Sequence, residues 1–400
     1  MRQGWRWFGP KDPVSLDDVR QAGATDVVTA LHETPIGVPW TLDGVRERQA
    51  LVAAANGSRT PLHWTVVESI PVHDDIKVGT PGHERYVDAF IRSMEALSAA
   101  GIRTICYNFM PVIDWTRTDL AFGLPTGGKA LRFDADAFAA FDLFLLKRPR
   151  AENDYAPVEI ERAERALAAM NEEARERLVR TVIAGLPGNM AGSYDLARFR
   201  DALSRYEGMD AERFRGRLVS FLESILPEAE RLSLKLAIHP DDPPFPLLGL
   251  PRVVSTDGDL ARLFGKLPSS ANGLTLCTGS FGVRPDNDLP GMAKRWADRI
   301  HFAHLRTTTR EAGRSFHEAE HLSGDVDLVP VVEVLLEEED RRREAGWDAW
   351  EIPFRPDHGH QILDDLGKTT NPGYSAIGRL KGLAEIRGIV AALRRRVSAP

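Results

Sequence analysis

The sequence lacks several features that mark particular classes of protein. Its 400 residues include only two cysteines, Cys106 and Cys277, which is too few for a disulfide framework and is typical of a reducing compartment. No apolar run approaches the length that spans a bilayer, and residues 1–13 lack the apolar stretch of a signal peptide. We therefore expect a cytoplasmic protein that has no membrane partner.

The chain also lacks an excess of basic charge. The chain has 51 Lys and Arg against 58 Asp and Glu, which gives a formal net charge of −7. A protein that coats nucleic acid usually has the opposite balance, because it must neutralise phosphates. The remaining composition is that of an ordinary globular chain, and a chain of this length can bury a large core. We expect a globular protein without a nucleic-acid partner.

Short apolar segments rich in β-branched and aromatic residues alternate with helix-length segments along the chain. Several are almost continuously apolar, which is typical of strands buried on both faces. Eight β/α alternations predict an α/β fold of the (β/α)8 TIM-barrel type. We prefer it to a doubly wound open sheet because no Gly-rich dinucleotide turn follows the first strand. The predicted strands are residues 5–8, 26–32, 62–69, 104–110, 233–239, 274–278, 300–305 and 350–354.

Most segments between these strands have apolar residues at helical spacing. Pro227 lies within the fourth predicted helix and should kink or split it, because proline lacks the N–H that an interior helical hydrogen bond needs. The predicted helices are residues 16–22, 42–55, 86–100, 218–232, 257–266, 288–298 and 329–344.

The alternation is interrupted at residues 119–216, where no strand candidate is convincing. Helical spacing is present at residues 163–186 and 193–206. We interpret 119–216 as a helical insertion between the fourth and fifth strands, either a cap over the barrel mouth or a surface for oligomerisation. Because there is no internal repeat or low-complexity linker, we expect residues 1–400 to form one catalytic domain. We also expect a homo-oligomer.

Four residues that can bind metals stand at the predicted carboxyl ends of four consecutive strands, where a TIM barrel builds its active site. They are His239, Cys277, His304 and Asp357. Imidazole, thiolate and carboxylate are all ligands of divalent transition metals. Each residue alone has a simpler structural explanation, such as a hydrogen-bonded histidine, a buried apolar cysteine or a capping aspartate. Together they predict a centre for one divalent metal.

Other side chains near this end could transfer protons or bind an anion. His358 and His360 follow Asp357, and histidine is the usual acid or base near neutral pH, although one of them could instead orient Asp357. Tyr374 follows a turn and could overhang the mouth, while packing is its simpler role. Arg306 has a planar fork that suits a substrate carboxylate, although an ion-paired arginine is the simpler default.

These and other motifs resemble those of the D-mannonate dehydratases of hexuronate catabolism. The resemblance covers essentially the whole chain. The motifs that carry it are WRWFGP at 5–10, CYNFMP at 106–111, DWTRTDL at 114–120, KALRF at 129–133, HPDDPP at 239–244, CTGS at 277–280, HLR at 304–306, RPDHGH at 355–360 and NPGYSAIGR at 371–379.

The resemblance implies a xylose-isomerase-like TIM barrel that removes water from D-mannonate to give 2-keto-3-deoxy-D-gluconate, a carbon–oxygen lyase reaction of glucuronate catabolism. It implies a divalent metal, Mn2+ first and Fe2+ or Co2+ as alternatives, held by the four ligands named above. It also implies that His358 and Tyr374 are the catalytic pair and that Arg306 lies near the substrate. The partner is then a small sugar acid.

The expected reaction is an elimination in which one protein group takes the C2 proton and another protonates the departing C3 hydroxyl. We expect Tyr374 as the base, if the metal and nearby cations lower its pKa, and His358 as the acid. The alternatives are a metal-dependent sugar isomerase, whose sites usually have Glu and Asp where this one has Cys277, a nuclease, which needs a basic groove, and a sugar-acid-binding protein, which needs no acid–base pair.

Overall fold

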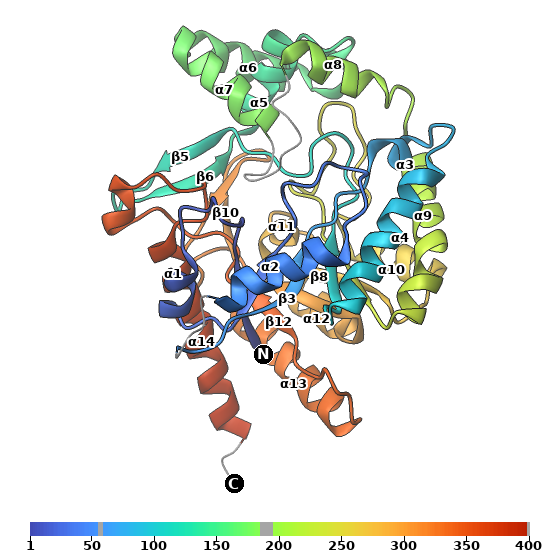
Figure 1. Cartoon of the computed structure of the whole chain (residues 1–400). Coiled ribbons are helices and arrows are strands. Elements are labelled where there is room, and N and C mark those ends of the chain that lie inside the picture. Colours follow the sequence, from blue (N-terminus) through green and yellow to red (C-terminus); the bar gives the residue numbers. More distant parts are fainter. Residues whose placement is uncertain (55–58, 185–194, 398–400) are drawn as a thin grey trace.

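Eight parallel strands close into a barrel in the computed structural model, which describes residues 1–54, 59–184 and 195–397 (Figure 1). Most of their side chains are buried, as expected where helices cover a parallel sheet. The predicted TIM barrel is confirmed, and each strand overlaps its predicted segment. In order around the barrel the strands are β1 (Arg2–Arg6), β2 (Asp26–Thr29), β3 (His63–Glu68), β4 (Thr104–Tyr107), β7 (Lys235–Ile238), β8 (Asn272–Cys277), β9 (Ile300–His304) and β12 (Pro353–Arg355), which pairs with β1.

The barrel interior is filled by side chains, as is usual for this fold. Val28, Val66, Cys106, Ala237 and Phe302 come from five different strands and form one buried cluster. Cys106 therefore lies in the packed interior, and neither it nor the other cysteine forms a disulfide. The packed interior leaves the carboxyl ends of the strands as the place where polar side chains gather.

Helices surround the barrel (Figure 1). The fourth predicted helix is not split at Pro227, because α9 continues through it. The buried face of α9, with Phe221, Leu222 and Ile225, stabilises the helix despite the lost hydrogen bond. In the described residues no helix is both long enough and apolar enough to cross a bilayer. The helices are α1 (Leu16–Gln21), α2 (Leu42–Ala54), α3 (Asp74–Val78), α4 (Glu84–Ala99), α9 (Ala211–Arg231), α10 (Asp257–Lys266), α11 (Thr278–Gly282), α12 (Leu289–Arg295), α13 (Leu328–Glu344) and α14 (Ala376–Val397).

The segment 119–216 contains strands as well as helices, so the prediction that it has no strand was wrong. β5 (Asp119–Gly123) and β6 (Lys129–Phe133) form an antiparallel sheet with β10 (Thr308–Arg310) and β11 (Phe316–Glu318), in the order β10-β11-β6-β5. β6 pairs with β11 through Phe133 and Phe316. No local pattern could show this pairing, because the two strands are far apart in the sequence.

The helices of this segment lie together above the barrel in Figure 1. The predicted helix at 163–186 is two helices where it is described, and residues 185 and 186 lie outside the described ranges, as do 193 and 194 of the next prediction. The small sheet lies between these helices and the barrel strands (Figure 1). The helices are α5 (Ala135–Ala140), α6 (Pro157–Ala168), α7 (Glu172–Ala184) and α8 (Leu196–Ser204).

Candidate metal centre

Three of the predicted ligands meet at the carboxyl ends of β7, β8 and β9. One ligand atom from each of His239, Cys277 and His304 lies within 4.8 Å of the others. Cys277 and His304 are register partners on neighbouring strands, and His239 follows the last residue of β7. The strand ends therefore bring an imidazole, a sulfur and a second imidazole to one point, as predicted.

The two imidazoles face each other through one ring nitrogen of each, His239 Nε2 and His304 Nδ1. His239 Nδ1 lies 2.7 Å from the carbonyl oxygen of Pro240, and because a carbonyl only accepts, Nδ1 must donate and Nε2 keeps its lone pair. That Nε2 lies 3.2 Å from His304 Nδ1. The other nitrogen of His304, Nε2, lies 3.5 Å from the carboxylate of Glu68, and a proton on Nε2 would leave a lone pair on Nδ1. Two facing lone pairs suit a cation between them, so the pair fits a divalent metal.

The sulfur of Cys277 is positioned by the turn that follows β8. Cys277 is fully buried and caps α11, where the backbone N–H of Ser280 donates to Sγ at 3.4 Å. The hydroxyl of Ser280 lies 3.1 Å from the same sulfur. A side chain at Gly279 would meet the side chain of Arg306 at 2.4 Å. Glycine at this position therefore allows the arginine to pass beside the sulfur.

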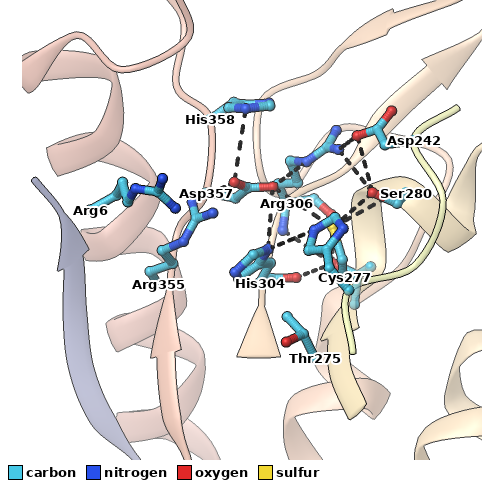
Figure 2. Close-up of polar contacts among 12 residues, drawn as sticks. Arg6, Asp242, Thr275, Cys277, Ser280, His304, Arg306, Arg355, Asp357 and His358 are labelled. Atoms are coloured by element: carbon cyan, nitrogen blue, oxygen red, sulfur yellow. Dashed lines mark hydrogen bonds and ion pairs between the residues drawn. The ribbon is translucent and has the colours of Figure 1, made fainter. Parts of the chain in front are cut away.

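Asp357 lies beside Cys277 and His304 (Figure 2). Its Oδ2 is 3.7 Å from the sulfur of Cys277 and 3.9 Å from Nδ1 of His304. Burial opposes ionisation, but Arg355 and other nearby cations outweigh it and hold the pKa of Asp357 well below its usual range. Its backbone is left-handed, with φ of 61°, a conformation that is costly for a residue other than glycine and is common at functional sites.

The carboxylate of Asp357 is held between two arginines. Arg355 binds Oδ1 and Arg306 binds Oδ2. Arg306 also donates through Nη1 to both oxygens of Glu318, at 2.7 and 2.6 Å, and through Nη2 to Asp242 at 2.6 Å. All three of its nitrogens are thus engaged by protein carboxylates. The ion-paired arrangement that was the simpler expectation for Arg306 is the one that the structure shows.

The two predicted catalytic side chains are neighbours. His358 and Tyr374 lie with their ring centroids 5.0 Å apart and their planes perpendicular. Gly359 forms a β-bridge with Tyr374, and the N–H of Gly359 donates to the carbonyl of Gly373 at 2.8 Å. Backbone pairing therefore holds the segment of His358 beside the segment of Tyr374. His360, in contrast, binds the backbone carbonyl of Glu318 at 2.8 Å. His360 therefore has a structural role.

The sequence model of the D-mannonate dehydratase (UxuA) family matches residues 1–399. The chain belongs to the D-mannonate dehydratase family.

Relatives of this family member share most of its length. A mannonate dehydratase of Chromohalobacter salexigens is 54% identical over 395 residues, which cover 98% of this chain and 99% of that protein. One of Brucella canis is 53% identical over 394 residues, covering 98% and 97%. The crystal structure of mannonate dehydratase from Streptococcus suis serotype 2 superposes with a TM-score of 0.76 at 32% identity, covering 100% of this chain and 95% of that one. A D-tagatose 3-epimerase-like protein, at 10% identity and a TM-score of 0.50, shares the fold.

Two carboxylates of this site, those of Glu68 and Glu318, were missed by sequence analysis. Glu68 is the last residue of β3, and a carboxylate that ends a buried strand is a signal that could have found it. Glu318 and Asp242 bind Arg306 and also Arg117, whose Nη1 lies 2.7 Å from Asp242 and whose Nη2 lies 2.8 Å from Glu318. Glu318 lies in β11, where no local signal marks it, because its partners come from distant parts of the chain.

Proposed function

We propose that this protein removes water from D-mannonate to form 2-keto-3-deoxy-D-gluconate, at one divalent metal bound by His239, Cys277, His304 and Asp357. The observation that carries the proposal is the pair of facing imidazole nitrogens 3.2 Å apart, beside a buried sulfur and a carboxylate. We propose Mn2+ as the ion, with Fe2+ or Co2+ as alternatives. Hydro-lyase chemistry agrees with the family to which the chain belongs.

The reaction breaks the C2–H and C3–O bonds of the sugar acid and forms a C2–C3 double bond, after which the enol ketonises. The C2 proton is poorly acidic, because the adjacent carboxylate is already negative and gains further charge as the proton leaves. A divalent metal at this site would supply Lewis-acid stabilisation of that charge. The chain must then provide one group that accepts a proton at C2 and one that donates a proton to the oxygen on C3.

His358 and Tyr374 are the two groups that we assign to these proton transfers. Our expectation made Tyr374 the base if the metal and nearby cations lower its pKa, whereas in the structure, which holds no metal, burial raises the pKa of Tyr374 to about 12 even though Arg355 acts in the opposite direction. The phenol therefore keeps its proton at neutral pH and suits the role of acid. His358 Nδ1 lies 3.2 Å from Glu318, and a carboxylate at Nδ1 leaves Nε2 to act as the base, as in other carboxylate–histidine pairs. We thus propose His358 as base and Tyr374 as acid, the reverse of our expectation from sequence.

We still propose that Arg306 lies near the substrate, and its ion pairs with protein carboxylates suggest a role for it. Its fork joins Asp357, Glu318 and Asp242, so we propose that it orients the Asp357 carboxylate and the Glu318 partner of His358. A substrate carboxylate would have to compete with these protein carboxylates for its N–H groups.

The organisation around the site is also proposed. We propose residues 1–400 as one catalytic domain, with 119–216 as a cap, because β5 and β6 join strands that follow β9 beyond the carboxyl end of the barrel. We further propose a homo-oligomer in the cytoplasm, acting in hexuronate breakdown.

Formation of a 2-keto-3-deoxy acid from D-mannonate tests the proposal. Protein stripped of metal should give no product, and added Mn2+ should restore turnover. The Cys277→Ala variant should stay inactive with Mn2+, while Cys106→Ala, at the other buried cysteine, should remain active. Folded wild-type protein that forms no product with Mn2+, Fe2+ or Co2+ would overturn the proposed reaction.

A further inference from the structure

Polar groups without partners gather at the ends of β1 and β2, next to β12 on the barrel circumference. The metal-ligand candidates come from β7, β8, β9 and β12, whereas Arg6 ends β1 and His32 follows β2. Arg6 Nε, Thr29 Oγ1 and His32 Nε2 are buried atoms that have no hydrogen-bond partner among the described residues. Buried polar atoms in proteins are normally paired. A group of such atoms at the active end of the barrel therefore indicates a place where a ligand supplies the partners.

These residues lie close to the proposed acid–base pair, with Phe8 between them. The ring of Phe8 is 4.8 Å from the ring of Tyr374 and 5.7 Å from that of His32. The guanidinium of Arg6 lies 4.9 Å from the same ring. Figure 2 shows Arg6 beside Arg355 and Asp357, on the side away from Cys277. One aromatic side chain thus separates His32 from Tyr374.

A cavity opens on this side of the barrel end. Its volume is about 680 Å³, and its lining includes Phe8, His32, Thr34, Trp40 and Asn371. These residues follow the carboxyl ends of β1, β2 and β12. The volume is within the range of about 300–1,000 Å³ typical of small-molecule sites. A six-carbon sugar acid that reacts at C2 and C3 has three further carbons with hydroxyls, and this cavity has room for them.

The free nitrogen of His32 is an acceptor. One ring nitrogen forms a hydrogen bond with the backbone of Trp7, and burial, followed by the nearby Arg6 cation, lowers the pKa of His32 to about 3. The neutral ring then has a lone pair on Nε2, which needs a donor. A hydroxyl can donate to it and an ionised carboxylate cannot. Arg6 Nε is a donor, so the two residues together can bind the hydrogen and the oxygen of sugar hydroxyls.

We propose that His32, with Arg6 beside it, forms a subsite that binds a hydroxyl on the C4–C6 part of the sugar acid and thereby selects polyhydroxy substrates. This subsite rests on the proposed dehydration, which places C1–C3 of the substrate at the metal centre. Arg306 cannot take this role in the same arrangement, because its nitrogens are bound to Asp357, Glu318 and Asp242.

Binding of unreactive acids to metal-loaded, full-length protein tests the subsite by calorimetry. One ligand is 3-deoxy-D-mannonate, which lacks the leaving hydroxyl, and the other is 2-hydroxybutanoate of the same C2 configuration, which lacks the C4–C6 hydroxyls. His32→Phe keeps a ring against Phe8 and should lower the affinity for 3-deoxy-D-mannonate about tenfold. The same variant should leave the affinity for 2-hydroxybutanoate unchanged. His32→Gln supplies an amide oxygen as acceptor and should recover part of the loss, and His63→Phe, at an exposed histidine that begins β3, should change neither ligand.

The other possible results distinguish failure of the subsite from failure of the proposed dehydration. The proposed subsite would be overturned if His32→Phe lost the same affinity for both ligands or lost affinity for neither. It would also be overturned if the wild type did not bind 3-deoxy-D-mannonate. Wild-type protein that shows the predicted binding pattern but does not turn over D-mannonate with any divalent metal would overturn the proposed dehydration and leave the subsite standing.

Discussion

Glu68 Oε2 lies 3.5 Å from His304 Nε2, on the opposite edge of the imidazole from the candidate metal centre. Arg355 donates to both oxygens of this carboxylate, at 2.9 and 2.7 Å, and Arg6 lies 2.7 Å from it. Burial opposes its ionisation, but Arg355 and Arg6 hold the pKa of Glu68 well below its usual range. A fixed carboxylate behind a ligand imidazole sets the tautomer and raises the basicity of the nitrogen that binds metal.

Replacing Glu68 should therefore weaken metal binding. Glu68→Gln removes the charge and keeps the shape, and we expect the affinity for Mn2+ to fall about 10- to 100-fold. Competition with a metal-binding dye measures this affinity without relying on turnover. Glu95→Gln, which alters an exposed ion pair with Arg231, is the matched control and should leave affinity unchanged. Wild-type affinity in Glu68→Gln would show that His304 is not held through this carboxylate.

Truncation of Arg306 should destabilise the fold and release the metal. It leaves three buried carboxylates, those of Asp357, Glu318 and Asp242, without their shared cation, and breaking a buried ion pair costs about 3–5 kcal/mol of unfolding free energy. Chemical denaturation of Arg306→Ala measures this cost. Arg180→Ala removes an exposed helical pair with Glu176 and should cost less than about 1 kcal/mol.

The milder Arg306→Lys variant distinguishes the two roles of this residue. If Arg306 orients Asp357, metal affinity falls together with kcat. If its main role is to bind the substrate carboxylate, KM rises while metal content and stability stay at wild-type values, and the network assignment is then wrong.

The acid–base assignment predicts loss of catalysis without loss of metal. Tyr374→Phe and His358→Asn should each lower kcat by about 10²- to 10⁴-fold, with metal content unchanged. Tyr86→Phe, at a tyrosine that stacks on His73, is the control. With His358 as base, exchange of the C2 proton with solvent deuterium should persist in Tyr374→Phe and disappear in His358→Asn. The opposite pattern would restore Tyr374 as the base.

Acid should destabilise the protein through His321. This side chain is buried and binds the carbonyl of Pro356 at 2.6 Å, and burial lowers its pKa to about 4. The unfolded chain, with a histidine pKa of about 6.5, binds more protons than the folded chain between these values. The contribution of His321 to the free energy of unfolding is therefore complete above pH 6.5. It is lost as the pH falls toward 4, at up to about 1.4 kcal/mol per pH unit.

Denaturation of wild type and His321→Gln between pH 7 and pH 5 measures this slope. The glutamine amide can still donate to the carbonyl but does not titrate, so the variant should show the shallower dependence. His63→Gln, at an exposed histidine, should keep the wild-type slope. Equal slopes in wild type and His321→Gln would contradict the assignment.

The proposed ligand residues could be picked out from the sequence because each is local to a strand. An apolar run that ends in His239, Cys277 or His304 shows both the strand and the residue at its carboxyl end, and a barrel brings such ends together. The network around them could not be predicted. Arg306 binds Asp242 and Glu318, which come from separate segments, and Glu318 lies in a strand whose pairing with β6 spans much of the chain.

The spectrum of Co2+-loaded protein tests the metal centre most directly. A cobalt–thiolate bond gives an intense near-ultraviolet charge-transfer band, so the band reports whether Cys277 is a ligand. We expect the band to saturate at one Co2+ per chain, to disappear in Cys277→Ser and to persist in Cys106→Ser. A wild-type protein that binds Co2+ without the band, or a Cys277→Ser variant that keeps it, would contradict the proposed centre.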